Sequence, residues 1–285
     1  MNRPSQHAIS KQVTLALEED LGGSIDINND ITACLIDART QANAKVITRE
    51  ECTVCGLDWV NETFSQVDSN LQITWFVKDG DKASANSTLF SVTGNARAIL
   101  TAERTALNFL QTLSGTATIT AKYAQLLAHT DTQILDTRKT LPGMRLAQKY
   151  AVLCGGGKNH RIGLFDAFLI KENHIAACGS IPKAIAKAKE MHPEKPVEVE
   201  VENFDELSQA IEAKADIIML DNFSNEQIQR AVDINQARCK LEVSGNITDE
   251  RLFSLAKLGV NYVSSGALTK HVQAIDLSLR LDIKH

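Results

Sequence analysis

The sequence lacks the features that mark several classes of protein. Among its 285 residues, no run approaches the roughly 20 consecutive apolar residues needed to cross a bilayer. Residues 1–20 contain no apolar run of the signal-peptide type. The net charge of −5 at pH 7 argues against a broad basic surface for nucleic acid. We therefore expect a cytoplasmic protein with neither a membrane nor a nucleic-acid partner.

A disulfide framework is also missing, because the six cysteines are scattered along a long chain. Cys52 and Cys55 form the single close pair, and no second pair of Cys or His residues at suitable spacing accompanies them to complete a structural zinc site. We expect two small, partly buried residues here, with redox chemistry as the alternative. The apolar content of 44% is enough to build a sizeable core in one large domain or two smaller ones.

The first part of the chain has the pattern of a small mixed domain. Residues 10–21 have helical spacing, and alternation of apolar and polar residues predicts short strands between about residues 43 and 93. The predicted strands are AKVITRE, CTVCGLDWV, LQITWFV and STLFSVTG. A long helical stretch follows over residues 96–127, and we expect it to break at Gly115.

The second part of the chain alternates short apolar runs with helical segments. The runs are QILD (133–136), AFLIK (167–171), VEVEV (197–201), DIIML (216–220), LEVS (241–244) and NYVSS (261–265). Strand and helix in alternation predict βαβ units and a parallel sheet. So many units in succession favour a barrel or partial barrel, and an open doubly wound sheet is the alternative.

Most of these strands end in a polar or charged residue, which is where active sites lie in such barrels. The cations at or near these ends are Arg138, Lys139, His160, Arg161 and Lys171. Cations that converge on one pocket repel one another unless a polyanionic ligand neutralises them, and Arg in particular binds carboxylates through two parallel hydrogen bonds. Solvated strand ends are the alternative explanation.

Two acidic strand ends, Glu200 and Asp221, accompany the cations. They suit a hard cation such as Mg²⁺, or a sugar that develops positive charge. The last two strands lead into Ser244-Gly245-Asn246 and Ser265-Gly266-Ala267, and each segment opens a helix. Glycine lets backbone N–H groups approach a ligand closely, so both segments favour phosphate binding, although Ser and Gly also cap helices that bind nothing.

Three consecutive glycines at 155–157 precede His160 and Arg161 but follow a helical segment, so they do not form a dinucleotide-binding motif. We interpret them as a flexible joint that places His160 and Arg161 over the pocket. A helix end with an exposed basic turn is the alternative.

Nearly the whole chain resembles the quinolinate phosphoribosyltransferase family. The matching segments are EDLGG…NNDIT (19–32), ERTALNFLQTLSG (103–115), DTRKTLPGMR (136–145), GGGKNHRIGL (155–164), IKENHI (170–175), EVEVENFDEL (198–207), IMLDNF (218–223), LEVSGNIT (241–248) and SSGALTKH (264–271). The resemblance implies an α/β fold with an N-terminal α/β sandwich domain (1–113) and a C-terminal incomplete α/β barrel (114–285). It also implies a homodimer or higher homo-oligomer, in which Glu103 and Arg104 reach the partner's active site.

The resemblance assigns a role to each candidate residue. The quinolinate-binding positions are Arg104, Arg138, Lys139, His160, Arg161 and Lys171. The positions for phosphoribosyl pyrophosphate are Glu200, Asp221, Ser244, Gly245, Asn246, Ser265, Gly266 and Ala267. Glu200 and Asp221 also hold Mg²⁺, directly or through water. Together with Lys139 and Lys171 they are the expected catalytic residues. Ser265 replaces a Val that is common in the family, and the adjacent Gly266 is retained.

The expected reaction joins quinolinate to phosphoribosyl pyrophosphate and releases carbon dioxide and pyrophosphate. A related transferase that acts on nicotinate is a second hypothesis, but a monocarboxylate would need fewer cations. A catalytically silent barrel that binds phosphorylated metabolites is a third, and the pair of acids argues against it.

Overall fold

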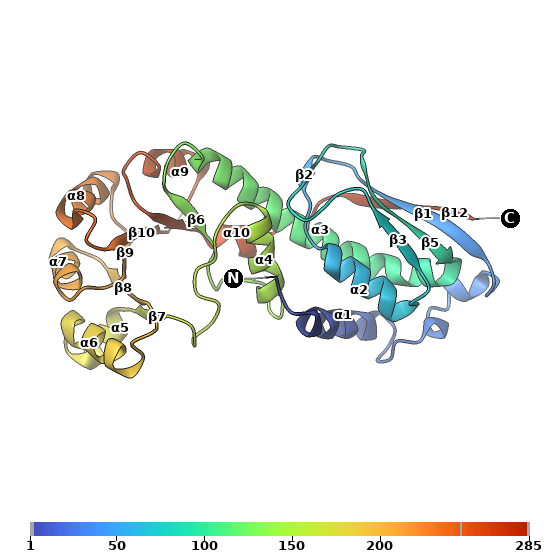
Figure 1. The fold of residues 1–285 in the computed structure, drawn as a ribbon, viewed down its shortest axis with the longest axis horizontal. Coiled ribbons are helices and arrows are strands. Elements are labelled where there is room, and N and C mark those ends of the chain that lie inside the picture. The colour runs from blue at the N-terminus through green and yellow to red at the C-terminus, as the bar shows by residue number, and fades with distance from the viewer. Residues whose placement is uncertain (1–2, 246, 284–285) are drawn as a thin grey trace. The chain divides into compact units, whose positions relative to one another are not determined.

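The computed structural model describes residues 3–245 and 247–283. The chain forms two compact units that are interleaved in sequence (Figure 1). Unit 1 comprises the residues up to 121, residues 142–156 and the residues from 272 onward. Unit 2 comprises residues 122–141 and 157–271. The predicted domain boundary after residue 113 stays a prediction.

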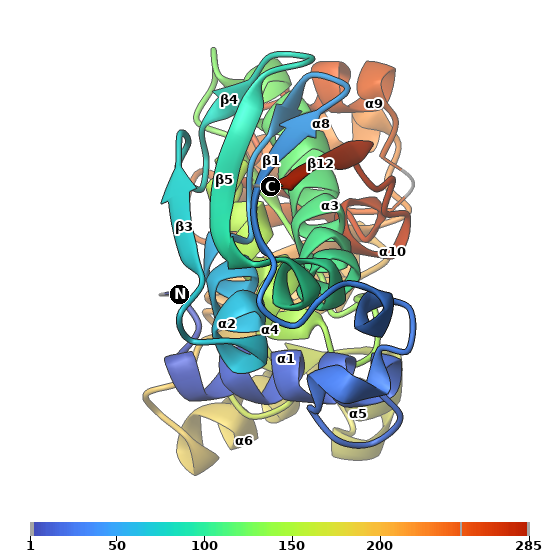
Figure 2. The ribbon, with the colours of Figure 1, turned by 90° about the vertical axis from the view of Figure 1, so that its right-hand side faces the viewer.

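Unit 1 contains an antiparallel sheet in the order β12-β1-β5-β3, whose strands lie side by side in Figure 2. Its strands are β1 (Gln41–Thr48), β3 (Gln72–Trp75), β5 (Thr88–Asn95) and β12 (Leu277–Ile283). Alternate side chains of β1 are buried, because successive residues of a strand point to opposite faces. A separate pair is formed by β2 (Cys52–Thr53) and β4 (Lys82–Ala83).

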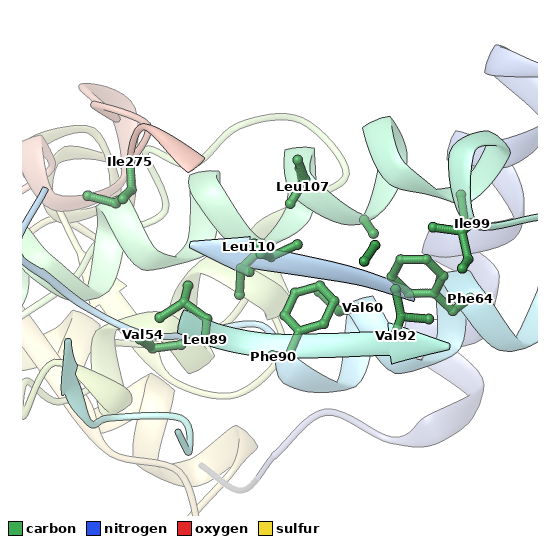
Figure 3. Close-up of a cluster of buried hydrophobic side chains, with 14 of the residues drawn as sticks. Val54, Val60, Phe64, Leu89, Phe90, Val92, Ile99, Leu107, Leu110 and Ile275 are labelled. Atoms are coloured by element: carbon green, nitrogen blue, oxygen red, sulfur yellow. The ribbon is translucent and has the colours of Figure 1, made fainter. Parts of the chain in front are cut away.

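Four helices complete unit 1, with two short 3₁₀ turns at Ile27–Asn29 and Ala33–Leu35. The helices are α1 (Gln6–Asp20), α2 (Leu57–Val67), α3 (Ala96–Leu127, which continues into unit 2) and α4 (Arg145–Cys154). The main core lies between the sheet and helices α2 and α3, where Phe64, Phe90 and Leu110 are buried (Figure 3). A second cluster packs α1 and α4 around Trp59 and Leu113.

Two local predictions for unit 1 are wrong. The segment CTVCGLDWV is a strand at Cys52–Thr53 alone, and α2 begins at Leu57. Apolar residues at positions 57, 60, 64 and 67 have helical spacing, which outweighs the β-branched residues before them. The helix over residues 96–127 does not break at Gly115. A Cβ there would lie 2.1 Å from the carbonyl oxygen of Gln273, so this glycine permits a close approach of backbone to the helix.

The strand β12 was not predicted. It pairs with β1 in antiparallel register from Thr48↔Leu277 to Ala42↔Ile283. Residues that follow all of unit 2 in the chain therefore complete the sheet of unit 1.

Unit 2 contains a parallel sheet in the order β6-β11-β10-β9-β8-β7. Its strands are β6 (Gln133–Leu135), β7 (Phe168–Ile170), β8 (Val197–Val201), β9 (Ile217–Asp221), β10 (Lys240–Ser244) and β11 (Tyr262–Ser264). Each coincides with one of the predicted apolar runs to within one residue at either end. The sheet is open between β6 and β7 in the described part of the chain, so the predicted incomplete α/β barrel is confirmed.

Helices connect these strands, as the sequence predicts. They are α5 (Glu172–Cys178), α6 (Ile181–Met191), α7 (Phe204–Glu212), α8 (Asn225–Asn235), α9 (Asp249–Leu255) and α10 (Ala267–Lys270). Helices α6, α7 and α8 lie side by side along the outer face of the strands (Figure 1). Within the described residues, no helix combines the length and apolar character that a membrane span requires.

Candidate active site

One face of the parallel sheet in unit 2 is polar. In β8, Val197, Val199 and Val201 are fully buried beneath α6 and α7, while Glu198 and Glu200 alternate with them and point to the other face. Parallel strands covered on both faces are usually apolar throughout. A strand that alternates between Val and Glu therefore indicates that its second face lines a site.

The register of the strands brings further polar side chains to the same face. Met219 of β9 pairs with both Glu200 of β8 and Glu242 of β10, and Asp221 pairs with Ser244. Residues paired in register point to the same side of a sheet. The acids predicted at the ends of β8 and β9 are therefore on neighbouring strands and on one face.

His160 lies against two buried acids of this face. Its Nε2 is 2.8 Å from Glu198 Oε2 and 3.6 Å from Glu242 Oε2. Its Nδ1 accepts a hydrogen bond from the backbone N–H of Arg161 at 2.7 Å, which puts the proton of the neutral ring on Nε2. These three side chains could in principle bind a cation.

Glu242 is fully buried, and its pKa is raised to about 8 by burial first and by the charge of Glu198 second. This carboxyl group is therefore mostly protonated at neutral pH. Protonation of Glu242 avoids placing two negative charges together in a buried position.

Asp136 holds the segment that carries His160. Its side chain is fully buried directly after β6, where it accepts hydrogen bonds from the backbone N–H of His160 at 2.9 Å and from Asn159 Nδ2 at 2.5 Å. Lys158 pairs with the backbone of β6 as well. Its backbone N–H donates to the Ile134 carbonyl at 2.9 Å, so the segment after the three glycines follows the edge strand of the sheet.

The charges of two arginines in this unit interact. Burial lowers the pKa of Arg161, and the positive charge of Arg138 lowers it further. The Nε atom of Arg138 is itself buried and makes no hydrogen bond. A buried N–H group with no acceptor is costly, and so is the repulsion between two guanidinium groups, but an anion between them removes both costs.

Lys171 and Glu200 form an ion pair in which Nζ and Oε2 are 2.5 Å apart. Lys171 follows β7, and its side chain is less buried than that of Glu200. The pair lies on neighbouring parallel strands, because β7 pairs with β8. A predicted cation and a predicted acid are thus in direct contact.

The segments after β10 and β11 differ in their surroundings. A Cβ on Gly245 would meet no atom within 4 Å, so the backbone after Ser244 faces open space. A Cβ on Gly266 would lie 2.7 Å from Lys139 Cδ, and Thr269 Oγ1 donates to the Lys139 carbonyl at 2.7 Å. Gly266 therefore lets the Lys139 loop pack against the end of β11.

The remaining candidates are placed as follows. Ser265 is buried, its backbone N–H bonds the Leu135 carbonyl at 3.0 Å, and its hydroxyl accepts from the Ala267 N–H at 3.3 Å. Asn246 lies outside the described residues. Arg104 is exposed on α3 and belongs to unit 1, whereas the other candidates belong to unit 2.

Comparison with known proteins identifies the family. Residues 26–114 match the N-terminal domain of quinolinate phosphoribosyl transferase, and residues 116–280 match its C-terminal domain. The chain belongs to the quinolinate phosphoribosyl transferase family.

Similar proteins of this family cover almost the whole chain. The solved structure of nicotinate-nucleotide pyrophosphorylase from Francisella tularensis is 54% identical, with a TM-score of 0.94 over 99% of this chain and 98% of that one. The probable nicotinate-nucleotide pyrophosphorylase [carboxylating] of Bacillus subtilis is 39% identical over 94% of this chain and 91% of its own length. Quinolinate phosphoribosyltransferase [decarboxylating] 2 of Nicotiana glauca is also 39% identical, over 96% of this chain and 82% of its own.

Within this quinolinate phosphoribosyl transferase chain, three residues of the candidate site escaped the sequence prediction: Asp136, Glu198 and Glu242. All three are buried acids on or directly after strands of unit 2. The sequence does contain a signal for Glu198 and Glu242, because VEVEV and LEVS each place a Glu inside a predicted parallel strand, where apolar residues are usual. Both positions lie inside their strands, whereas the predicted residues lie at strand ends.

Proposed function

We propose that this chain transfers the phosphoribosyl group of phosphoribosyl pyrophosphate to quinolinate, with loss of carbon dioxide, to give nicotinate mononucleotide and pyrophosphate. The observation that carries this proposal is the buried Arg138 Nε that has no acceptor, together with a second guanidinium, Arg161, whose charge interacts with that of Arg138. Two adjacent guanidinium groups suit a planar dicarboxylate, because each can hold a carboxylate through two parallel hydrogen bonds.

In this proposal the cations orient quinolinate. Arg138 and Arg161 bind its carboxylates, while His160 and Lys139 complete the pocket. Arg104 is exposed on α3, and we assign it to the active site of a second copy in a homodimer or larger homo-oligomer. Holding the ring nitrogen against the anomeric carbon contributes to the rate through positioning.

The acidic face binds the donor. Glu200 and Asp221 offer carboxylate oxygens on neighbouring strands, the ligand type that Mg²⁺ prefers. They would hold Mg²⁺, directly or through water, and the bound ion would neutralise charge on the pyrophosphate leaving group. The open backbone at Ser244-Gly245 and the helix start at Ser265-Gly266-Ala267 suit the 5-phosphate. Asn246 completes this set by resemblance.

The reaction then has two steps. The ring nitrogen attacks the anomeric carbon as its bond to pyrophosphate breaks, and Glu200 and Asp221 stabilise the positive charge that develops on the ribose. When the bond to the 2-carboxylate breaks, its electron pair stays on C2, where the adjacent positively charged ring nitrogen stabilises it until a proton replaces the lost carbon dioxide. Lys139 and Lys171 are the residues that we assign to steering this loss and the protonation that follows. All these groups act in the cytoplasm, where we place the protein.

Steady-state kinetics with quinolinate, phosphoribosyl pyrophosphate and Mg²⁺ test the proposal, with nicotinate mononucleotide and carbon dioxide as the measured products. Arg138→Ala should raise the KM for quinolinate about ten- to a hundredfold, since a charged hydrogen bond contributes roughly 1.5–3 kcal/mol. The KM for the donor should change far less. The matched control is Lys183→Ala, which removes an exposed cation on α6. It should leave the KM values for quinolinate and for the donor unchanged.

Two results would refute the assignment. Equal increases of both KM values in Arg138→Ala would show that this residue does not distinguish the substrates. Turnover of nicotinate without turnover of quinolinate would move the activity to a monocarboxylate.

A further inference from the structure

Unit 1 contains a group of side chains that the proposed reaction does not use. Cys55, Asp79 and Cys154 place a sulfur or carboxylate oxygen each within 4.8 Å of the others. Both cysteines are free thiols. Cys55 lies between β2 and α2, and Cys154 is the last residue of α4.

The backbone of Cys55 is fixed against α3. Its N–H donates to Ser114 Oγ at 3.0 Å, and the same hydroxyl donates to the Cys55 carbonyl at 3.3 Å. The following residue, Gly56, has φ +124°, and a Cβ there would lie 3.3 Å from Leu113 Cδ1. The chain at Cys55 therefore packs directly on α3.

The backbone of Cys154 is fixed against the same helix. A Cβ on the next residue, Gly155, would lie 2.4 Å from the Ala117 carbonyl oxygen and 2.6 Å from Thr120 Cβ, so the end of α4 contacts α3 closely. Gly80 also packs against Cys154, because a Cβ on Gly80 would lie 3.4 Å from the Cys154 carbonyl oxygen. Both cysteines therefore lie in backbone that packs closely against α3.

Asp79 already has hydrogen-bond partners for both oxygens. Its Oδ1 accepts from the N–H groups of Gly56 at 2.8 Å and Leu57 at 3.2 Å, which caps α2 in place of a side chain at Gly56. Its Oδ2 accepts from the Tyr150 hydroxyl at 2.9 Å. The Asp79 carboxylate is thus already engaged in capping α2 and in binding Tyr150, and chemistry between the two thiols leaves these bonds intact.

We propose that Cys55 and Cys154 are an oxidation site, at which a hydroperoxide converts the two thiols into a disulfide. Cys154 is partly exposed and Cys55 is fully buried, so the peroxide reaches Cys154 first. The Cys154 sulfur attacks one peroxide oxygen, the O–O bond breaks, and the other oxygen leaves as water. Cys55 then attacks the resulting sulfenic acid, the S–O bond breaks, and a second water leaves.

The atoms and electrons of this sequence balance. Two thiols are oxidised to one disulfide, and one hydrogen peroxide molecule is reduced to two water molecules. The two sulfurs lie within 4.8 Å of each other, and a disulfide bond requires them to approach to about 2 Å.

The electrostatic surroundings agree with this order of events. A hydrogen bond with the Cys55 thiol lowers the pKa of Cys154, while burial raises the pKa of Cys55. The thiolate is the nucleophile in thiol oxidation, so the partly exposed cysteine is also the more reactive one. Cys55 is suited to the second step, in which it resolves the sulfenic acid.

Peptide mapping tests the proposal on the intact, folded protein. The reduced protein is treated with one equivalent of hydrogen peroxide, alkylated under denaturing conditions, digested and analysed by mass spectrometry. We expect a linked peptide pair containing Cys55 and Cys154, loss of two alkylatable thiols and full recovery with dithiothreitol. The oxidised protein should also unfold at a higher temperature, because the bond closes a long loop in the unfolded chain.

Variants separate the two roles. In Cys55→Ser the link should be absent, and dimedone should trap Cys154 as a sulfenic acid. Cys178→Ser removes another partly exposed cysteine, on α5, and should form the link as the native sequence does. Near-ultraviolet circular dichroism checks that each variant keeps its packed core.

Two outcomes would overturn the proposal. One is the absence of the Cys55–Cys154 link while Cys154 oxidises to a sulfinic acid in the native sequence. The other is stoichiometric zinc in the purified protein that is lost in both Cys55→Ser and Cys154→Ser, which would make the group a metal site. Neither readout uses transferase activity, so the proposal stands or falls separately from the proposed function.

Discussion

Replacing Glu242 with Gln removes one buried, titratable carboxyl group from unit 2 while keeping its shape. The pKa of Glu242 is raised from 4.5 to about 8 in the folded protein, by burial and by Glu198. A carboxyl group with a raised pKa binds its proton more tightly in the folded state than in the unfolded state. Its contribution to stability is therefore complete below about pH 4.5 and is lost as the pH rises through about 8.

The size of this effect follows from the pKa. Each pH unit between these values removes about 1.4 kcal/mol, and the whole rise corresponds to roughly 5 kcal/mol. Urea unfolding of both proteins at pH 5.5 and pH 7.5 isolates the contribution of Glu242, because all other groups titrate in both. The stability of Glu242→Gln relative to the native sequence should increase by about 3 kcal/mol between these two pH values.

A matched control is Glu190→Gln, which makes the same chemical change at an exposed position on α6. It should shift stability by the same small amount at both pH values. A stability difference between Glu242→Gln and the native sequence that stays constant from pH 5.5 to 7.5 would refute the protonated state that we assign to Glu242.

Three further substitutions test other contacts. Gly115→Ala should destabilise unit 1 by about 1–3 kcal/mol in urea unfolding, since its Cβ would meet the Gln273 carbonyl oxygen at 2.1 Å, and a gain in stability would contradict this packing. Gly266→Ala should displace Lys139 and lower kcat/KM about tenfold, which corresponds to about 1.4 kcal/mol of lost transition-state stabilisation. The circular dichroism spectrum should stay unchanged. Unaltered kinetics would disprove this contact between Gly266 and Lys139. Phe90→Ala should cost about 3–5 kcal/mol in the same unfolding assay, because its ring is fully buried, and a loss below 1 kcal/mol would be inconsistent with that burial.

The sequence predicted unit 2 well because local and long-range preferences agree there. Most of the apolar runs are followed by a helix that packs on the sheet, and all six predicted strands are present. In unit 1 the two conflict. The segment that begins at Cys52 is rich in β-branched residues but continues as α2, and β12 pairs with a strand more than 200 residues away, which no local pattern can indicate.

The sequence indicated candidate residues at the ends of strands but did not indicate the buried acids Asp136, Glu198 and Glu242. Polar residues at strand ends, such as Lys171 and Asp221, stand out in a sequence because a turn follows them. Asp136 is also at a strand end, but its function depends on hydrogen bonds to Asn159 and His160, which only coordinates reveal. The pKa of Glu242 depends on Glu198 across the sheet, so neither residue alone indicates it.

The pairing of β12 with β1 has a consequence for the order in which the chain folds during synthesis. The ribosome delivers β1, β3 and β5 early, but β12 follows every residue of unit 2. Until then β1 is an unpaired edge, and such edges are prone to pair with strands of other chains. A nascent chain stalled after residue 271 should therefore expose β1 to chaperones or aggregation, although unit 2 has already been synthesised in full.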